Sequence, residues 1–451
     1  MSRYSPNTSQ ERKQMFSDIG LQSFEELLTN IPDEIRLKRK LNIPDAMSEM
    51  ELLKRAEELA GKNADTGKYM CFLGAGCYDH YIPAVISHIL SRQEFYTAYT
   101  PYQPEISQGI LQAMFEYQTM ICELTGMDAS NASLYDGATS VAEAAAMVCR
   151  DTGKKQVLAA SSMHPEYRHV LRTYARFGGH GIKELRYNNG QLDLTGLESA
   201  ISADTAAVVV QTPNFFGIIE NLEDISRIVH QHNAFLIVST DPVSLGILKP
   251  PGSLGADIVV GEGQPLGNPM SFGGPFLGFF AVTGRWIRKM PGRVVGVTSD
   301  KHGKRAYTLT IQTREQHIRR EKATSNICSN QALNALTAAA YLTVMGKQGF
   351  CEVAEQCLRK SHYAYDILLQ SEQFAPVFKA PFFKEFVVKP SIDVAKLNQN
   401  LLQYHILGGY PLEKEYPNLP NCWLLAVTEK RTHKEIDMLA EKALEIKKGG
   451  M

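Results

Sequence analysis

Two apolar runs in the middle of the chain, Ala206-Ala-Val-Val-Val-Gln211 and Phe235-Leu-Ile-Val-Ser239, decide the fold. Both are short, continuous and rich in β-branched residues, and a helical pattern at 222–232 lies between them. Short strands that are apolar on both faces and alternate with helices are typical of a parallel sheet that helices cover on both sides. The two runs therefore predict a βαβ unit.

The same alternation continues on both sides of this unit. Further apolar runs lie at Gln156–Ala160, Lys183–Tyr187, Asp257–Val260 and Phe276–Val282, and further helical patterns lie around 141–150, 165–177 and 194–203. A long helix with an apolar stripe precedes them and ends at Gly126. We therefore predict a large α/β domain with a mostly parallel sheet over residues 66–330.

Different patterns flank the large domain. Residues 1–65 predict short helices, since Ser48 and Glu51 form a capping-box pattern. We expect this N-terminal helical arm to pack on another subunit or on the main body. Residues 331–451 predict a smaller C-terminal α+β domain. Its expected elements are two helices up to about 370, a strand at Glu385–Lys389, a helix around 391–402, a strand at Cys422–Thr428 and a helix around 432–447.

Composition and charge exclude several classes of protein. The 451 residues carry 47 Lys and Arg against 48 Asp and Glu, a net charge of −1, so there is no basic footprint for nucleic acid or for an anionic membrane. No apolar run reaches the roughly 18 residues of a membrane span, and the polar N-terminus has no leader pattern. None of the eight cysteines forms a C-x-x-C or a zinc-type spacing. We expect a cytoplasmic protein with reduced, buried thiols and no metal.

Three features point to a cofactor site, although each also has an ordinary structural interpretation. Asp136-Gly-Ala-Thr139-Ser140 opens a helix, where backbone N–H groups bind phosphate or a side chain simply caps the helix. Asp241 ends a buried strand, where a carboxylate either holds a protonated pyridine nitrogen or caps a turn. His164 follows another strand and lies over a cofactor ring or is a plain loop residue.

Together, this order of features is that of aminotransferase-like, fold-type I pyridoxal-phosphate enzymes. Those enzymes need a lysine for the Schiff base a few tens of residues after the aspartate. Lys249 lies only eight residues past Asp241, and 250–288 contains no lysine. Where the lysine is expected, the chain reads Gly261-Glu-Gly-Gln-Pro265, and no side chain there can form an imine.

Longer motifs resemble the P-protein family of the glycine cleavage system, from about residue 10 to the end. They are Tyr96-Thr-Ala-Tyr-Thr-Pro-Tyr-Gln-Pro-Glu-Ile-Ser-Gln-Gly109, Gly126-Met-Asp-Ala-Ser-Asn-Ala-Ser-Leu134, Gln211-Thr-Pro-Asn-Phe-Phe-Gly217, and Gly261-Glu-Gly-Gln-Pro-Leu-Gly267 with Phe272-Gly-Gly-Pro275. The chain resembles the N-terminal half of one-chain P-proteins, which is a separate subunit in many bacteria.

The resemblance implies a division of labour between two subunits. The Schiff-base lysine and the pyridoxal phosphate would belong to a lysine-bearing subunit 2, in a complex with two of each subunit. Together they would decarboxylate glycine and pass an aminomethyl group to the lipoyl arm of H-protein. No catalytic residue would then lie in this chain. Thr139, His164 and Asp241 would be relics of a cofactor pocket with structural roles.

The resemblance leaves residues 96–109, which we call the aromatic loop, as the expected contribution to the partner's active site. Fold-type I enzymes build each site at a subunit interface, and the two prolines of the loop stiffen it. The side chains expected to reach glycine and the lipoyl arm are Tyr96, Tyr99, Thr100, Tyr102, Gln103 and Glu105. The alternative is a loop that only buries area in the subunit interface.

Two other functions stay open. One is a self-sufficient pyridoxal-phosphate homodimer with its lysine at Lys289, Lys301 or Lys304, which the lysine-free window 250–288 disfavours. The other is a pseudoenzyme scaffold that only stabilises the partner subunit and supplies no group to the site.

Overall fold

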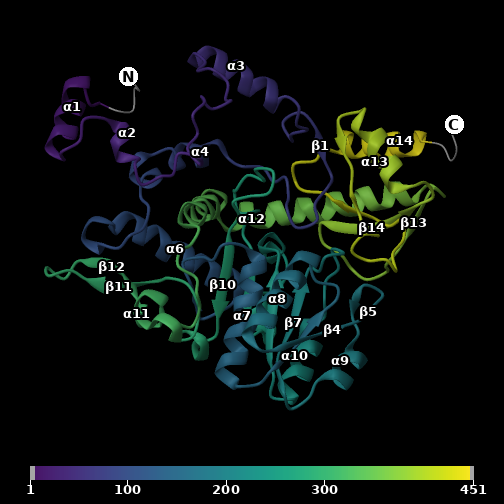
Figure 1. Ribbon diagram of the computed structural model, residues 1–451. Helices are drawn as coiled ribbons and strands as arrows, with labels where there is room; N and C mark the ends of the chain where they lie inside the picture. The colour runs from purple at the N-terminus through teal and green to yellow at the C-terminus, as the bar shows by residue number, and fades with distance from the viewer. Residues whose placement is uncertain (1–5, 447–451) are drawn as a thin grey trace. The chain divides into compact units, whose positions relative to one another are not determined.

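The computed structural model describes residues 6–446 and divides into two compact units, Met1–Ala64 and Asp65–Met451. The first unit contains helices α1 (Ser9–Asp18), α2 (Phe24–Leu27) and α3 (Glu49–Ala60) (Figure 1). The Ser48 side chain accepts the Glu51 N–H at the start of α3 and the Glu51 carboxylate accepts the Ser48 N–H, as the sequence predicts. None of these three helices buries a residue. What the arm packs against therefore stays a prediction.

The second unit is built on a seven-stranded sheet in the order β2-β10-β9-β8-β7-β3-β4. Its strands are β2 (Ala129–Ser130), β3 (Gln156–Ala160), β4 (Gly181–Leu185), β7 (Thr205–Thr212), β8 (Phe235–Thr240), β9 (Ile258–Glu262) and β10 (Gly278–Val282). Strands β4, β3, β7, β8 and β9 run parallel, whereas β10 pairs antiparallel with β9 on one side and with the edge strand β2 on the other. The predicted, mostly parallel sheet is confirmed.

Helices pack on this sheet because their apolar faces match its buried strands. They are α6 (Gln108–Thr125), α7 (Gly137–Thr152), α8 (Pro165–Gly178), α9 (Leu194–Ala200) and α10 (Leu222–Gln231). Every residue of β9 and β10 is buried, and α7 packs across β7, β8, β9 and β10. Gly126 and Gly153 end α6 and α7 in the left-handed conformation, which glycine adopts without strain.

The long helix α12 (Ala332–Leu369) leads to the C-terminal sheet. Gly346 breaks its helical backbone, so it forms the two predicted helices. The sheet order is β13-β14-β17-β16, all antiparallel. Its strands are β13 (Phe374–Pro376), β14 (Glu385–Pro390), β16 (Tyr410–Pro411) and β17 (Trp423–Ala426), and its helices are α13 (Val394–Leu402) and α14 (His433–Glu445). Residue 447, expected at the end of the last helix, lies outside the described residues. The predicted domain border at residue 330 stays a prediction.

Several elements were not predicted from the sequence. A hairpin of β11 (Val294–Ser299) and β12 (Arg305–Thr310) packs on α6, and β1 (Met70–Cys71) pairs in parallel with β15 (Ile406–Leu407) beside the C-terminal sheet. Other short elements include α4 (Ala84–Leu90), α5 (Gln93–Tyr96), β5 (Tyr187–Asn188), β6 (Gln191–Leu192) and α11 (Gln316–Arg319).

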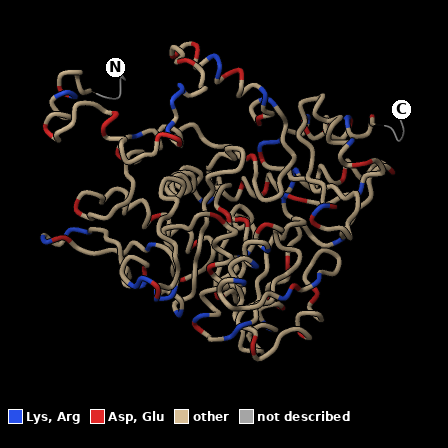
Figure 2. The backbone as a smooth tube through the Cα atoms, viewed as in Figure 1, with Lys and Arg blue, Asp and Glu red and all other residues tan. Residues whose placement is uncertain are grey.

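The distribution of charged residues and the hydropathy of the helices agree with what the composition predicts. Lys and Arg are interspersed with Asp and Glu along the chain (Figure 2). Within residues 6–446, no helix is both long and apolar enough to cross a membrane.

Candidate functional site

Three parts of the second unit meet at the carboxyl ends of the parallel strands. Asp241 follows β8, Glu262 ends β9, and Lys384 immediately precedes β14 of the C-terminal sheet. With His164 and Pro265, these residues line a small cavity of about 30 Å³. We call this the strand-end pocket. The structure thus brings together the predicted positions His164, Asp241 and Pro265.

An ion pair that the sequence did not predict fills one side of the pocket. The Lys384 Nζ lies 2.7 Å from Asp241 Oδ2, and the Lys384 side chain is only 2% exposed. The other Asp241 oxygen accepts the Val243 N–H at 3.0 Å, so Asp241 also caps the turn that starts at Pro242. Both of its oxygens therefore bond within the chain.

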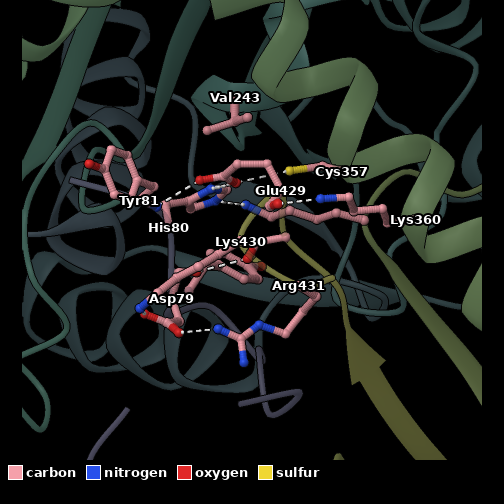
Figure 3. Close-up of polar contacts among 12 residues, drawn as sticks. Asp79, His80, Tyr81, Val243, Cys357, Lys360, Glu429, Lys430 and Arg431 are labelled. Atoms are coloured by element: carbon pink, nitrogen blue, oxygen red, sulfur yellow. Dashed lines mark hydrogen bonds and ion pairs between the residues drawn. The ribbon is translucent and has the colours of Figure 1, made fainter. Parts of the chain in front are cut away.

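The Lys384 ammonium has two further partners. It lies 3.4 Å from the centroid of the Tyr78 ring, in a cation–π contact, and 3.1 Å from His80 Nε2. An ammonium can only donate, so Nε2 accepts and His80 Nδ1 donates to Glu429 Oε2 at 2.6 Å. Figure 3 shows His80 held by Glu429 in this way.

The residues behind His80 could hold a metal by their type alone. His80, Cys357 and Glu429 each place one ligand atom within 4.8 Å of the others. However, Lys384 donates to His80, and the Lys360 Nζ donates to the Glu429 carbonyl oxygen (Figure 3). Two ammonium groups beside the donors oppose a metal cation. We interpret the group as a hydrogen-bonded support for Lys384.

Glu262 fills the other side of the pocket, at the N-terminus of α7. Its carboxylate accepts the backbone N–H groups of Gly137 at 3.0 Å, Gln264 at 3.0 Å and Leu277 at 2.8 Å. Burial raises the pKa of Glu262 to about 7, and these three bonds oppose the rise. Thr139 bonds through its own N–H to the Asp136 carboxylate at 2.7 Å, and it does not line the pocket. The helix end expected to bind phosphate therefore contacts the chain's own carboxylates.

His164 is enclosed by side chains and by the loop 74–78. Its ring stacks on Tyr167 with 4.8 Å between centroids and meets Phe215 edge-on. Its Nε2 lies 3.0 Å from the Ala75 carbonyl oxygen, to which it donates. Gly76 lies so close that an added Cβ would stand 2.6 Å from His164 Nε2. Burial lowers the pKa of His164.

Glu385 and Gln264 fasten the loop 74–78 over the pocket. Glu385 accepts the Ala75 N–H at 2.8 Å and the Tyr78 hydroxyl at 2.8 Å. Gln264 accepts the Tyr78 N–H at 3.0 Å and donates to the Tyr78 carbonyl oxygen at 3.1 Å. Burial raises the pKa of Glu385 to about 7. The pocket is therefore closed on this side by hydrogen bonds within the chain.

The aromatic loop lies elsewhere and points outward. Tyr96, Tyr99 and Tyr102 are 70%, 84% and 65% exposed, and Gln103 and Glu105 are exposed as well. Thr100 is half-buried and accepts a hydrogen bond from Arg293 at 3.4 Å, while the Arg293 guanidinium lies 5.5 Å from the centroid of the Tyr102 ring. No residue of the loop lines the strand-end pocket.

The cysteines differ in part from the expectation. All eight are free thiols. Cys149, Cys357 and Cys422 are buried, but Cys328 is exposed, so burial does not hold for every thiol.

Comparisons with known proteins agree on the family. A model described as glycine cleavage system P-protein matches residues 2–442. Two relatives named "Probable glycine dehydrogenase (decarboxylating) subunit 1" are similar over nearly the whole chain. The one from Carboxydothermus hydrogenoformans is 55% identical over 97% of this chain and 98% of its own length. The one from Anoxybacillus flavithermus is 53% identical over 98% of each.

Solved structures give the fold. A crystal structure of glycine decarboxylase (P-protein) of the glycine cleavage system, in inhibitor-bound form, has a TM-score of 0.90 and 41% identity over 98% of this chain and 99% of that one. A NIFS-like protein has a TM-score of 0.62 at 14% identity, over 84% of this chain and 98% of that one, and so shares the fold alone. The chain has the fold-type I architecture of pyridoxal-phosphate enzymes, as the sequence predicts.

The strand-end pocket of this chain does not fit pyridoxal phosphate. Pro265 offers no amine, Asp241 is paired with Lys384, and the Gly137 N–H is bonded to Glu262. The cavity that remains, of about 30 Å³, has room for only a water molecule or two.

Proposed function

The chain belongs to the family of glycine cleavage system P-proteins, and we propose that it is the subunit of a heteromeric glycine decarboxylase that carries no Schiff-base lysine. The observation that supports this proposal is that Pro265, near the position where we expect the lysine, lines the strand-end pocket together with an Asp241 that is already paired. The name "subunit 1" of the relatives supports a second subunit.

The proposal assigns the Schiff-base lysine and the cofactor to a second subunit. A lysine-bearing subunit 2 holds pyridoxal phosphate, two of each subunit form the enzyme, and the assembly works in the cytoplasm. Glycine loses CO₂, its aminomethyl group passes to one lipoyl sulfur of H-protein, and the lipoyl disulfide is reduced in the same reaction.

This chain contributes the aromatic loop to the partner's active site. Tyr96, Tyr99 and Tyr102 present hydroxyls and ring faces to solvent within this chain, and Gln103 and Glu105 add polar groups beside them. A tyrosine hydroxyl is a suitable donor to the glycine carboxylate, because hydrogen bonds to charged acceptors are the stronger ones. Arg293 holds Thr100 and Tyr102 and thereby orients the loop.

Glycine turnover with separated subunits tests this function. We expect this chain alone to show no exchange between the glycine carboxyl group and bicarbonate, even with H-protein present. Adding the lysine-bearing subunit should restore exchange. Exchange by the isolated chain, or one lysine of this chain labelled stoichiometrically after incubation with pyridoxal phosphate and borohydride, would establish the self-sufficient enzyme instead.

The pseudoenzyme scaffold is the second candidate, and the filled strand-end pocket favours it. A pocket that is filled by the chain's own side chains contributes to the stability of the subunit and not to ligand binding. The two functions differ only in whether the aromatic loop supplies groups to the partner's site, and substitutions in that loop separate them.

A further inference from the structure

We infer that two side chains of this chain have taken over the positions of the cofactor's charged groups, with Lys384 as the cation on Asp241 and Glu262 as the anion at the N-terminus of α7. This goes beyond the proposed function, because it concerns this chain's own pocket rather than the partner's active site. Its consequence is a pocket that is closed to pyridoxal phosphate and that joins the central sheet to the C-terminal sheet.

The cation side is complete without a ligand. A strand-end carboxylate in this fold is suited to a protonated pyridine nitrogen, and here it lies 2.7 Å from the Lys384 ammonium. Asp241, His80 and the face of the Tyr78 ring surround the ammonium. A buried charge is tolerated only when it is paired and hydrogen-bonded, and this one meets both conditions.

The anion side is complete as well. The first N–H of α7, that of Gly137, bonds to Glu262 Oε2, and the N–H groups of Gln264 and Leu277 bond to Oε1. A helix N-terminus favours a negative group, and the buried Glu262 carboxyl group, with three N–H donors and a pKa raised to about 7, supplies one when it ionises. A phosphate at this helix end would have to displace Glu262 from the Gly137 N–H.

The two sides join separate parts of the second unit. Asp241 and Glu262 end strands of the central sheet, whereas Lys384 and Glu385 lie at the start of β14 in the C-terminal sheet. Glu385 holds the loop 74–78 in the same place. In this chain the ion pair therefore links the two sheets, with no bound molecule required.

A wider cavity of about 580 Å³ outside His164 does not provide a cofactor site. It shares Gly76, His164, Tyr167 and Glu262 with the strand-end pocket, but neither Asp241, Pro265 nor Lys384 lines it. A ligand held there would lie outside the lining formed by the Asp241–Lys384 ion pair.

Calorimetry with pyridoxine 5′-phosphate tests whether the pocket is closed. This probe has the ring nitrogen and the phosphate but no aldehyde, so surface lysines cannot form an imine with it. Titrated into the full wild-type chain, it should give no saturable heat. Saturable one-to-one binding would overturn the inference.

A double-mutant cycle tests the ion pair itself. Asp241→Asn and Lys384→Met each leave one buried charge without its partner, so each should lower the midpoint of thermal unfolding by several degrees. The double variant removes both charges, and we expect it to lose much less than the sum of the two single losses. If one single variant gives no soluble protein, cooperative unfolding of the double variant supports the same conclusion.

The control for the cycle is an exposed pair on the same unit. Lys249 lies 3.4 Å from Glu223, with side chains 73% and 68% exposed, and Glu223→Gln with Lys249→Met should leave the midpoint unchanged. Additive losses at Asp241 and Lys384 would overturn the inference. The cycle is read from unfolding of this chain alone, so its failure is distinct from a failure of the proposed function, which is read from turnover.

Discussion

The strand-end pocket and the aromatic loop differ in how completely the chain satisfies their polar groups. In the pocket, Asp241, Glu262 and Lys384 are buried and bonded within the chain. In the loop, Tyr96 and Tyr99 are more than two-thirds exposed. The buried groups of the pocket need no ligand to satisfy them, whereas the exposed groups of the loop are free to contact another molecule, which is the role that we propose for them.

We expect the largest loss of stability from a substitution that disrupts the packing at the strand-end pocket. Gly217 has a φ of +80°, and an added Cβ would lie 1.9 Å from the Glu385 carbonyl oxygen. Gly217→Ala should therefore lower the free energy of unfolding by on the order of 4 kcal/mol, because strain and overpacking add. Gly303 is the matched control, since its φ is +75° and no atom lies within 4 Å. Gly303→Ala should cost about 1 kcal/mol in the same denaturant titration. Equal losses would mean that the contact with Glu385 contributes nothing.

The second prediction concerns how the stability of the chain depends on pH through the buried Glu385 carboxyl group. In the folded chain Glu385 keeps its proton up to about pH 7, because burial raises its pKa from the ordinary 4.5. Between these values the folded state binds more protons than the unfolded state, so stability falls as pH rises. Glu385→Gln keeps both hydrogen bonds, since the Tyr78 hydroxyl can accept from the new amide.

The variant should therefore remove part of the loss of stability between pH 5 and pH 8, on the order of 2–3 kcal/mol. The measurement is the free energy of unfolding at each pH, compared with wild type. Glu223→Gln, at a carboxylate that is 68% exposed, serves as the control and should leave the slope unchanged. A Glu385→Gln slope identical to that of wild type would contradict the protonated, buried carboxyl.

Turnover separates the aromatic loop from the pocket. Tyr→Phe at Tyr96, Tyr99 or Tyr102 removes one hydroxyl and keeps the ring. A hydroxyl bonded to a charged group contributes about 1.5–3 kcal/mol, so at least one variant should lose tenfold to a hundredfold in kcat/KM. Gln103→Ala should behave similarly, and Tyr404→Phe, at an exposed tyrosine outside the loop, should not.

These variants should keep the unfolding midpoint and the association of the two subunits, because the side chains are exposed. Near-normal kinetics in all four loop variants would favour the scaffold function. The same conclusion would follow if every loss of activity accompanied a loss of subunit association.

The sequence predicted the parts of the fold in which neighbouring residues carry the signal. The apolar runs at 206–211, 235–239 and 257–260 became β7, β8 and β9, because strands buried on both faces need no polar alternation. The hairpin β11–β12 was missed although Gly303 marks its turn, since its strands mix polar and apolar residues and both of them are partly exposed.

The residues of the site also divide into those that a local motif predicts and those that only the folded chain brings together. Pro265 and the strand-end position of Asp241 were readable from local motifs, and the structure places both on the pocket. Lys384 could not be predicted in this way, because it lies 143 positions after Asp241 and only the packing of the two sheets brings the two residues together. The one local signal was a Lys-Glu pair directly after Phe382 and Phe383, which is unusual for a buried strand end. The Glu262 side chain lay inside a recognised motif, but its bond to α7 requires the folded turn.

The smallest expected effect concerns the support of the loop. Arg293 is 5% exposed, donates to Thr100 and lies over the Tyr102 ring, so we interpret it as a positioning residue. Arg293→Lys keeps the charge but loses the planar fork and much of the ring contact, about 1 kcal/mol, or roughly a fivefold loss in kcat/KM. Arg285 is the control, since its guanidinium lies over the rings of Phe235 and Trp286, which do not belong to the loop, and Arg285→Lys should leave turnover unchanged. Positioning, unlike simple packing, predicts that Tyr102→Ala abolishes the effect of Arg293→Lys on turnover. If the two losses add instead, Arg293 acts by a route that does not involve Tyr102, and its hydrogen bond to Thr100 is then the contact that orients the loop.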